Sequence, residues 1–305
     1  MTSVSINVWI NTGPWTWKAR SRRISVPRLL SPDSRFGVVV PRYRATMTTG
    51  YGAASAALTA TALTATEAPR AGLDFAALLG TWPLLATARR GDGHPVLVLP
   101  GWLAGDPATG LLRSVLRGLG HNVSGWSLGT NRGPNVHVVQ ELRSRLERLH
   151  HDSGRTVSLI GWSLGGMYAQ ELARASPGSV RRLITLGSPV LRRRAWTQNM
   201  SRIADRTPHL PRAGAALPRP WAESGSLRVP ATSVYTRADG IVAWSTCRYG
   251  AGPRRENVEV RGSHLGLAHN PAVLWLLADR LGQNEGRWKA FRPPLPLRPF
   301  FPGRV

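Results

Sequence analysis

The chain has 305 residues, 42% of them apolar, which is enough for one large domain or two small ones with a sizeable core. Its single cysteine, Cys247, excludes an intrachain disulfide, as expected in a reducing compartment or in a protein that does not depend on disulfides. The sequence has no zinc-spaced Cys/His cluster, no H-E-x-x-H and no P-loop. We therefore expect neither a metal nor another cofactor.

The formal net charge is +24, a value that would fit a nucleic-acid-binding protein. Its distribution argues against that function, because residues 1–46, 189–228 and 287–305 together carry 18 of the 24 charges. The excess thus lies on the two ends and one internal stretch, and we do not expect nucleic-acid binding. Peripheral contact of these arginines with an anionic surface is compatible with the pattern.

Residues 1–70 are expected to form a disordered extension, since residues 1–46 show no periodicity, and Met47 is an alternative start. The SRRIS motif lacks the apolar stretch of a twin-arginine signal, because Pro27 and Pro32 follow it. No window has the roughly 20 continuous apolar residues that a membrane helix needs. We therefore expect a cytoplasmic protein.

The folded domain is expected over residues 71–286, beginning with an amphipathic helix at 71–86. Beyond it, short apolar runs predict strands buried on both faces, and apolar residues at three- and four-residue steps predict amphipathic helices. The predicted strands are 95–100, 121–126, 156–160, 181–188, 229–236 and 257–262, and the predicted helices are 107–119, 136–149, 165–175 and 272–281. Such alternation predicts an α/β fold with a mostly parallel, doubly wound sheet flanked by helices.

Two proline-rich segments depart from this alternation. Residues 189–228 hold five prolines and no clear strand, and they lie where a lid or cap can be inserted into the domain. Residues 287–305 hold five more prolines and are predicted to form an extended tail.

The pentapeptide GWSLG occurs twice, at Gly125–Gly129 and at Gly161–Gly165. Both copies fit G-x-S-x-G, which marks a serine nucleophile on a sharp turn between a strand and a helix. The second copy follows a predicted strand, has small residues on both sides and opens a predicted helix. The first copy runs into TNRGP, whose Gly-Pro pair prevents a continuous helix. We therefore predict Ser163 as the nucleophile.

A serine nucleophile needs a base to take its proton and an acid to orient that base. His264 lies on the loop between the last predicted strand and the last helix, and His269, five residues on, is the alternative base. Asp239 directly follows a predicted strand, whereas Asp205 lies in the predicted lid and Asp279 lies inside the last helix. These positions favour Asp239 and His264 as the acid and the base.

The first GWSLG copy ends the strand that comes next along the chain after the loop Pro100–Trp102. Parallel strands all end at the edge of the sheet where ligands bind. We therefore expect Ser127, Asn131 and Arg132 to line the pocket that Ser163 serves.

The chain order Ser163, Asp239, His264 and the strand placement resemble the α/β-hydrolase fold family. The resemblance covers about residues 71–284, with the strongest matches at PGW, LIGWSLGG, TRADGIV and GSHLGL. Within the family the chain is most similar to the bacterial esterases and lipases. One departure is Pro100-Gly101, where many lipases carry His-Gly in the oxyanion loop.

The resemblance implies a small-molecule or lipid ester as substrate and an acyl-enzyme mechanism. Ser163 attacks the ester carbonyl, His264 takes its proton and Asp239 stabilises the imidazolium. The backbone N–H groups of Trp102 and Leu164 form the oxyanion hole. Two alternatives stay open: an acyltransferase with the same triad, and a non-catalytic binding protein of the same fold.

Overall fold

The computed structural model describes residues 2–13, 16–26, 59, 61–190 and 227–303. The chain divides into two compact units, Met1–Thr48 and Thr49–Val305.

The first unit contains an antiparallel pair of strands, β1 (Thr2–Gly13) and β2 (Thr16–Val26). This pairing differs from the disordered extension that we expected. A local signal was present, because Val4, Ile6, Val8 and Ile10 alternate with other residues at the period of two that is typical of a strand. Residues 27–58 lie outside the described part of the chain.

The second unit is built on a six-stranded parallel sheet in the order β4-β3-β5-β6-β7-β8. The prediction of a mostly parallel α/β sheet is confirmed. Each predicted strand corresponds to an observed one: β3 (Pro95–Leu99), β4 (Asn122–Ser124), β5 (Val157–Trp162), β6 (Val180–Leu186), β7 (Ala231–Tyr235) and β8 (Arg255–Glu259). Since β3 lies between β4 and β5, the strand order reverses there, and in open α/β sheets such a reversal marks the edge where ligands bind.

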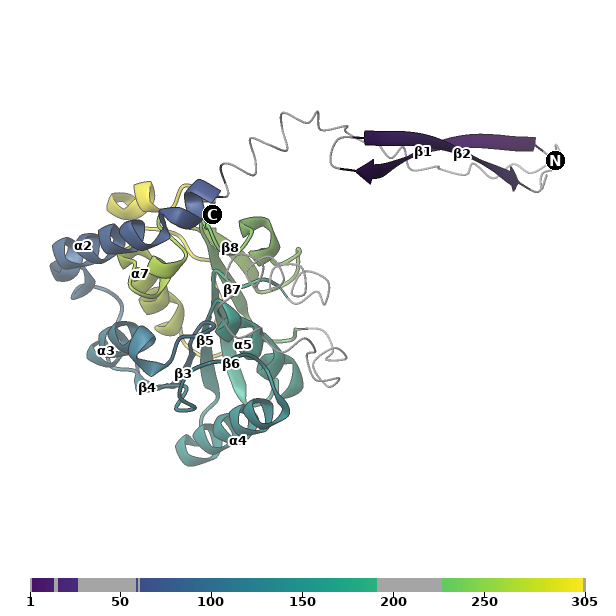
Figure 1. Ribbon diagram of the computed structural model, residues 1–305. Coiled ribbons are helices and arrows are strands. Elements are labelled where there is room, and N and C mark those ends of the chain that lie inside the picture. The colour runs from purple at the N-terminus through teal and green to yellow at the C-terminus, as the bar shows by residue number, and fades with distance from the viewer. Residues whose placement is uncertain (1, 14–15, 27–58, 60, 191–226, 304–305) are drawn as a thin grey trace, which may run out of the picture. The chain divides into compact units, whose positions relative to one another are not determined.

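Helices cover both faces of this sheet (Figure 1). On one face lie α2 (Glu67–Leu85), α3 (Gly110–Gly118) and α7 (Pro271–Leu281), and on the other lie α4 (Val136–Ser153) and α5 (Leu164–Ala175). Short 3₁₀ helices span Asp106–Thr109, Trp244–Cys247, Leu265–Ala268 and, as η5, Leu295–Phe300.

The two faces of the sheet have separate apolar cores. In β3, Val96 and Val98 join the core under α2, α3 and α7, whereas Leu97 and Leu99 join the core under α4 and α5. Successive strand side chains point to opposite faces, so a strand covered on both sides, such as β3, is buried at every position and is mostly apolar. This explains why continuous apolar runs, without alternation, predicted the strands correctly.

Helix α2 begins before the domain boundary that we predicted at residue 71. Its first residue, Glu67, is 3% exposed, and Asp74, two turns further on, is 9% exposed. Charged side chains are almost never buried without partners. The folded domain therefore includes part of the segment that the sequence assigned to the extension.

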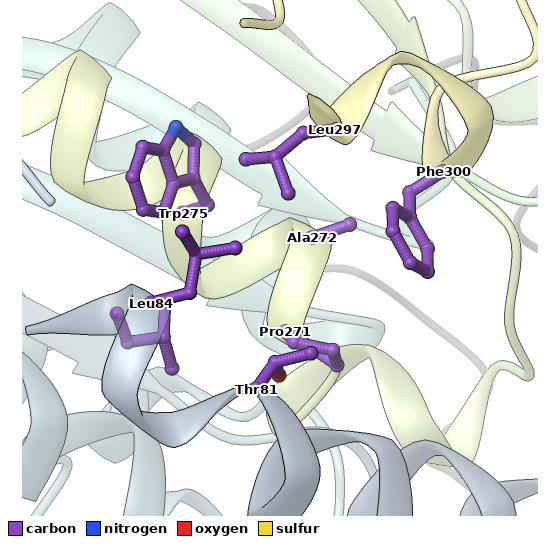
Figure 2. A pocket seen from close by; sticks show the side chains of 8 residues that line it. Thr81, Leu84, Pro271, Ala272, Trp275, Leu297 and Phe300 are labelled. Carbon is purple, nitrogen blue, oxygen red and sulfur yellow. The ribbon is translucent and has the colours of Figure 1, made fainter. Parts of the chain in front are cut away.

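The C-terminal segment also differs from expectation, because it packs against the domain instead of forming an extended tail. Phe291, Leu297 and Phe301 are buried, and the rings of Phe291 and Phe301 lie 4.9 Å apart. Figure 2 shows where η5 meets α2 and α7, with Leu297 near Trp275 and Phe300 on the side of Ala272 and Pro271. The gap between them is about 20 Å³, which holds about one water molecule, so it is a packing gap and too small for an organic ligand.

The predicted lid, 189–228, falls almost wholly outside the described residues, since 191–226 are among those not described. It therefore stays a prediction. Within the described part of the chain, no helix combines the length and apolarity needed to cross a membrane.

Candidate active site

Ser163 stands at the turn between β5 and α5. Its backbone has φ 54° and ψ −121°, a strained conformation for a residue with a side chain. The turn is held in place by the Ser163 N–H, which donates to the Leu186 carbonyl of the neighbouring strand β6 at 2.8 Å. Strain of this kind is typical of a nucleophile elbow, which presents the serine hydroxyl above the end of the sheet.

The glycines on both sides of Ser163 are required by close backbone contacts. A Cβ at Gly161 would overlap Gly166 at the start of α5, and one at Gly165 would overlap the Leu99 carbonyl at the end of β3. The helix can begin directly after Ser163 only because these backbones approach so closely. The small residues that favoured this GWSLG copy in the sequence thus have a steric reason.

Asp239 and His264 meet at the same end of the sheet, Asp239 after β7 and His264 after β8. The Asp239 Oδ2 and His264 Nδ1 atoms are 2.7 Å apart, and both side chains are buried. The other carboxylate oxygen of Asp239 accepts the N–H groups of Ile241 and Val242, at 2.9 and 2.6 Å. The acid is thereby fixed in its turn and oriented toward the imidazole.

The surroundings of His264 favour its protonated form. Burial by itself lowers the pKa of an imidazole, but the carboxylate of Asp239 and, more weakly, that of Glu67 raise the pKa of His264 above its ordinary value. A base with a raised pKa accepts a proton more readily from an attacking hydroxyl.

The end of β6 brings the His264 ring close to the elbow. A Cβ at Gly187, directly after β6, would lie 3.0 Å from His264 Nδ1. The residue before Gly187, Leu186, accepts the backbone hydrogen bond from the Ser163 N–H. In addition, Trp162 Nε1 donates to the His264 carbonyl at 3.1 Å. Ser163 and the His264 ring, both described, are not hydrogen bonded to each other, and such contacts often form only when substrate binds.

The loop after β3 lies directly against Ser163, because a Cβ at Gly101 would lie 3.3 Å from the Ser163 Cβ. Within the described residues, the N–H groups of Trp102 and Leu164 donate to no acceptor. That of Leu164 is one of the free N–H groups at the start of a helix, where the helix dipole favours negative charge. Two amide donors are therefore available beside the hydroxyl.

Of the three residues predicted to line the pocket, Asn131 is completely buried. Its Nδ2 donates to the Pro100 carbonyl at 3.0 Å, and its backbone carbonyl accepts the Leu103 N–H at 2.8 Å. Asn131 therefore braces the loop that carries Trp102. Ser127 and Arg132 are exposed, and their part in a pocket stays a prediction.

The first GWSLG copy repeats the backbone strain of the second but not its setting. Ser127 has φ 57°, yet no helix follows it. The amides of Trp126 and Ser127 donate to the carboxylate of Asp106 at 2.9 and 2.8 Å. These contacts tie the turn to Asp106, and because no helix begins at Leu128, the turn has no helix N-terminus to favour an oxyanion beside the Ser127 hydroxyl.

The other candidate acids and bases lie away from this pair. His269 Nε2 is bonded to the Ala71 carbonyl at 2.9 Å, and Asp279 pairs with Arg280 on α7. Asp205 falls outside the described residues. No group of three or more His, Cys, Asp or Glu side chains that could bind a metal occurs in the described part of the chain.

Three charged residues of α2, which the sequence did not single out, form hydrogen bonds to the loops carrying Asp239 and His264. Glu67 accepts the N–H groups of Gly240 and Leu265, and Asp74 accepts the N–H and the hydroxyl of Ser263. Arg70 donates to the Ala238 carbonyl at 2.7 Å. The signal that could have found them is the spacing of three and seven residues, which places all three on one helix face.

Comparison with known proteins gives no matching family model and no matching curated protein. Among solved structures, a thermophilic esterase from Thermogutta terrifontis is 17% identical, over 63% of this chain and 90% of that one, with a TM-score of 0.45. An extracellular alpha/beta-hydrolase from a Paenibacillus species is 14% identical, over 61% and 96%, with a TM-score of 0.44. Alpha/beta hydrolase domain-containing protein 10 from mouse is 15% identical, over 63% and 89%, with a TM-score of 0.43.

The architecture of this chain is that of the α/β-hydrolase fold. The parallel sheet in the order β4-β3-β5-β6-β7-β8 and the elbow between β5 and α5 define this class of protein. The resemblance seen in the sequence is thus confirmed at the level of the fold.

Proposed function

We propose that the protein is a serine hydrolase that cleaves carboxylic esters through an acyl-enzyme on Ser163. The observation that carries the proposal is the buried 2.7 Å contact between Asp239 and His264 at the sheet edge where Ser163 occupies a strained turn. A nucleophile after β5, an orienting acid after β7 and a base after β8 are the parts that acyl transfer requires.

In the first half of the reaction, the Ser163 Oγ attacks the ester carbonyl carbon and its proton passes to His264 Nε2. The Asp239 carboxylate holds the Nδ1 proton and stabilises the imidazolium. The carbonyl oxygen becomes an oxyanion, and the N–H groups of Trp102 and Leu164 donate to it. One such donor contributes about 3 kcal/mol of transition-state stabilisation.

The tetrahedral intermediate collapses when the carbon–oxygen bond to the leaving group breaks. The alcohol leaves with the proton from His264, and the acyl group stays on Ser163. A water molecule then attacks the acyl-enzyme, with His264 again taking the proton, and the acid is released.

The experiment compares Ser163→Ala with Ser127→Ala. Both serines lie in GWSLG and both have positive φ, so the two variants introduce the same chemical change in similar backbones. Hydrolysis of p-nitrophenyl esters and labelling by a fluorophosphonate are measured. Ser163→Ala should lose labelling, and its kcat should fall by about 10⁶-fold, whereas Ser127→Ala should keep its labelling and its kcat, and the predicted pocket role of Ser127 would change only its KM.

Unchanged hydrolysis by a folded Ser163→Ala chain would refute the catalytic proposal and favour the binding-protein alternative. Product transfer to an added alcohol in preference to water would instead identify an acyltransferase. An ester panel of increasing acyl length then defines the substrate class.

A further inference from the structure

Glu67 on α2 joins the two loops that carry the proposed acid and base. Its Oε1 accepts the Gly240 N–H at 2.7 Å, and its Oε2 accepts the Leu265 N–H at 3.0 Å. Gly240 directly follows Asp239, and Leu265 directly follows His264. One carboxylate, from a residue more than 170 positions away in sequence, thus holds the immediate neighbours of both members of the pair.

The burial of Glu67 shows that this arrangement is specific. The residue is 3% exposed, and burying a carboxylate is costly unless its oxygens are bonded. Hydrogen bonds to a charged acceptor are about twice as strong as neutral ones. A bridge made by both oxygens therefore restrains the separation of the two loops more tightly than two independent neutral contacts would.

Arg70, one turn further along α2, reinforces the bridge. Its guanidinium lies 2.9 Å from Glu67 Oε1 and donates to the Ala238 carbonyl, directly before Asp239, at 2.7 Å. The two side chains form an ion pair one turn apart on the helix. The Asp239 turn is thus held on both sides, through Ala238 and through Gly240.

We propose that Glu67 is a positioning residue that keeps Asp239 and His264 in hydrogen-bonding contact. The proposal rests on the function proposed above. Glu67 is hydrogen bonded to the backbone of both loops and not to the side chain of Asp239 or His264. It therefore acts on catalysis through the positions of these loops and through its charge.

The charges around His264 allow the effect of Glu67 to be isolated. Within the described residues these are Asp239 from the β7 turn, Glu67 with its partner Arg70 from α2, and Asp74, which reaches the loop through Ser263. The Glu67 carboxylate helps to raise the pKa of His264. Its removal should therefore lower that pKa, while a change at Asp74 should not.

The test uses Glu67→Gln, which retains one acceptor oxygen and loses the charge. Hydrolysis of a p-nitrophenyl ester is followed from pH 5 to 9, below each variant's unfolding temperature. We expect kcat/KM to fall by about tenfold or more, as for the loss of a hydrogen bond to a charged group. The acid limb of the kcat/KM profile should move to lower pH, because His264 loses a nearby negative charge.

The matched control is Asp74→Asn, on the same helix face and bonded to the same loop at Ser263. It should lower the thermal midpoint but leave the acid limb in place. Glu67→Asp retains the charge with a shorter side chain, so its acid limb should stay near that of the wild type. If Glu67→Gln fails to fold, the pH profile of Glu67→Asp is used in its place.

An acid limb that is unchanged in Glu67→Gln, or that moves equally in Asp74→Asn or Glu67→Asp, would overturn the proposal. Ser163→Ala is assayed alongside. If wild-type protein hydrolyses the ester and Ser163→Ala does not, a negative result concerns Glu67 alone. Equal activity in wild type and Ser163→Ala would instead refute the proposed function.

Discussion

At the scale of single residues, Asp239 is the group whose role depends most on geometry. One of its oxygens holds His264, and the other is occupied by two backbone N–H groups. An amide of the same shape would fill the site but could present an N–H to His264, which would select the wrong imidazole tautomer. The shape of the site can therefore be kept while its chemistry is lost.

We expect Asp239→Asn to lower kcat by about 10⁴-fold with little change in fold, measured by ester hydrolysis and by circular dichroism. Asp279→Asn is the control, because Asp279 lies on α7 and pairs with Arg280. It should retain wild-type kcat. A large loss of kcat in the control and none in Asp239→Asn would reverse our assignment of the acid.

His264 determines the pH dependence of the reaction. The base must be neutral to accept a proton, and its pKa is raised above the ordinary value of 6.5. Activity should therefore fall as the pH drops through this raised pKa, with half-maximal kcat/KM above pH 6.5. His269→Gln should leave this midpoint unchanged, whereas a midpoint well below pH 6.5 would contradict the assignment of His264 as the base.

At the scale of elements, the C-terminal segment belongs to the folded domain. The Phe291 N–H donates to Glu256 Oε2 at 2.7 Å, and its ring is completely buried in the core under α7. In contrast, Phe300 on η5 is 38% exposed. Two phenylalanines of one segment therefore differ clearly in burial.

Phe291→Ala should reduce the free energy of unfolding by about 3–5 kcal/mol, the cost of an emptied aromatic site in a core. Phe300→Ala should cost much less, since part of its ring is already in contact with water. Urea unfolding of both variants measures the difference. Equal and small losses would mean that the segment does not contribute to the core.

At the scale of the whole molecule, stability against acid should depend on a histidine outside the candidate site. His121, directly before β4, is 4% exposed, and in the described structure neither ring nitrogen has a hydrogen-bond partner. Burial lowers the pKa of His121 from 6.5 to about 4. The folded protein therefore binds this proton less readily than the unfolded chain does.

Because the unfolded chain binds this proton more readily, neutral His121 stabilises the folded protein fully above pH 6.5. This contribution to the free energy of unfolding is lost as the pH falls from 6.5 toward 4. Urea midpoints measured from pH 7 to pH 4 should fall over this range. The fall should be smaller in His121→Leu, which has no proton to gain. Parallel curves for the two proteins would show that other groups cause the acid sensitivity.

Most of the fold could be predicted because its signals are local. A strand buried on both faces is mostly apolar, and a turn with a strained serine needs glycines beside it. For the same reason the order Ser163, Asp239, His264 could be proposed from the ends of the predicted strands. The β1–β2 pair was missed although its alternation of apolar residues was present in the sequence.

The sequence by itself determined the alternation of strands and helices and the choice between the two GWSLG copies, since these depend on residues near one another in the chain. Only the tertiary structure decided that Asn131 braces the Trp102 loop, that Phe291 is buried and that Glu67 bridges the two loops. Each of these roles is set by partners distant in sequence, and the side chain alone gives no sign of them. The physical reason is that burial and bridging depend on which surfaces meet after folding.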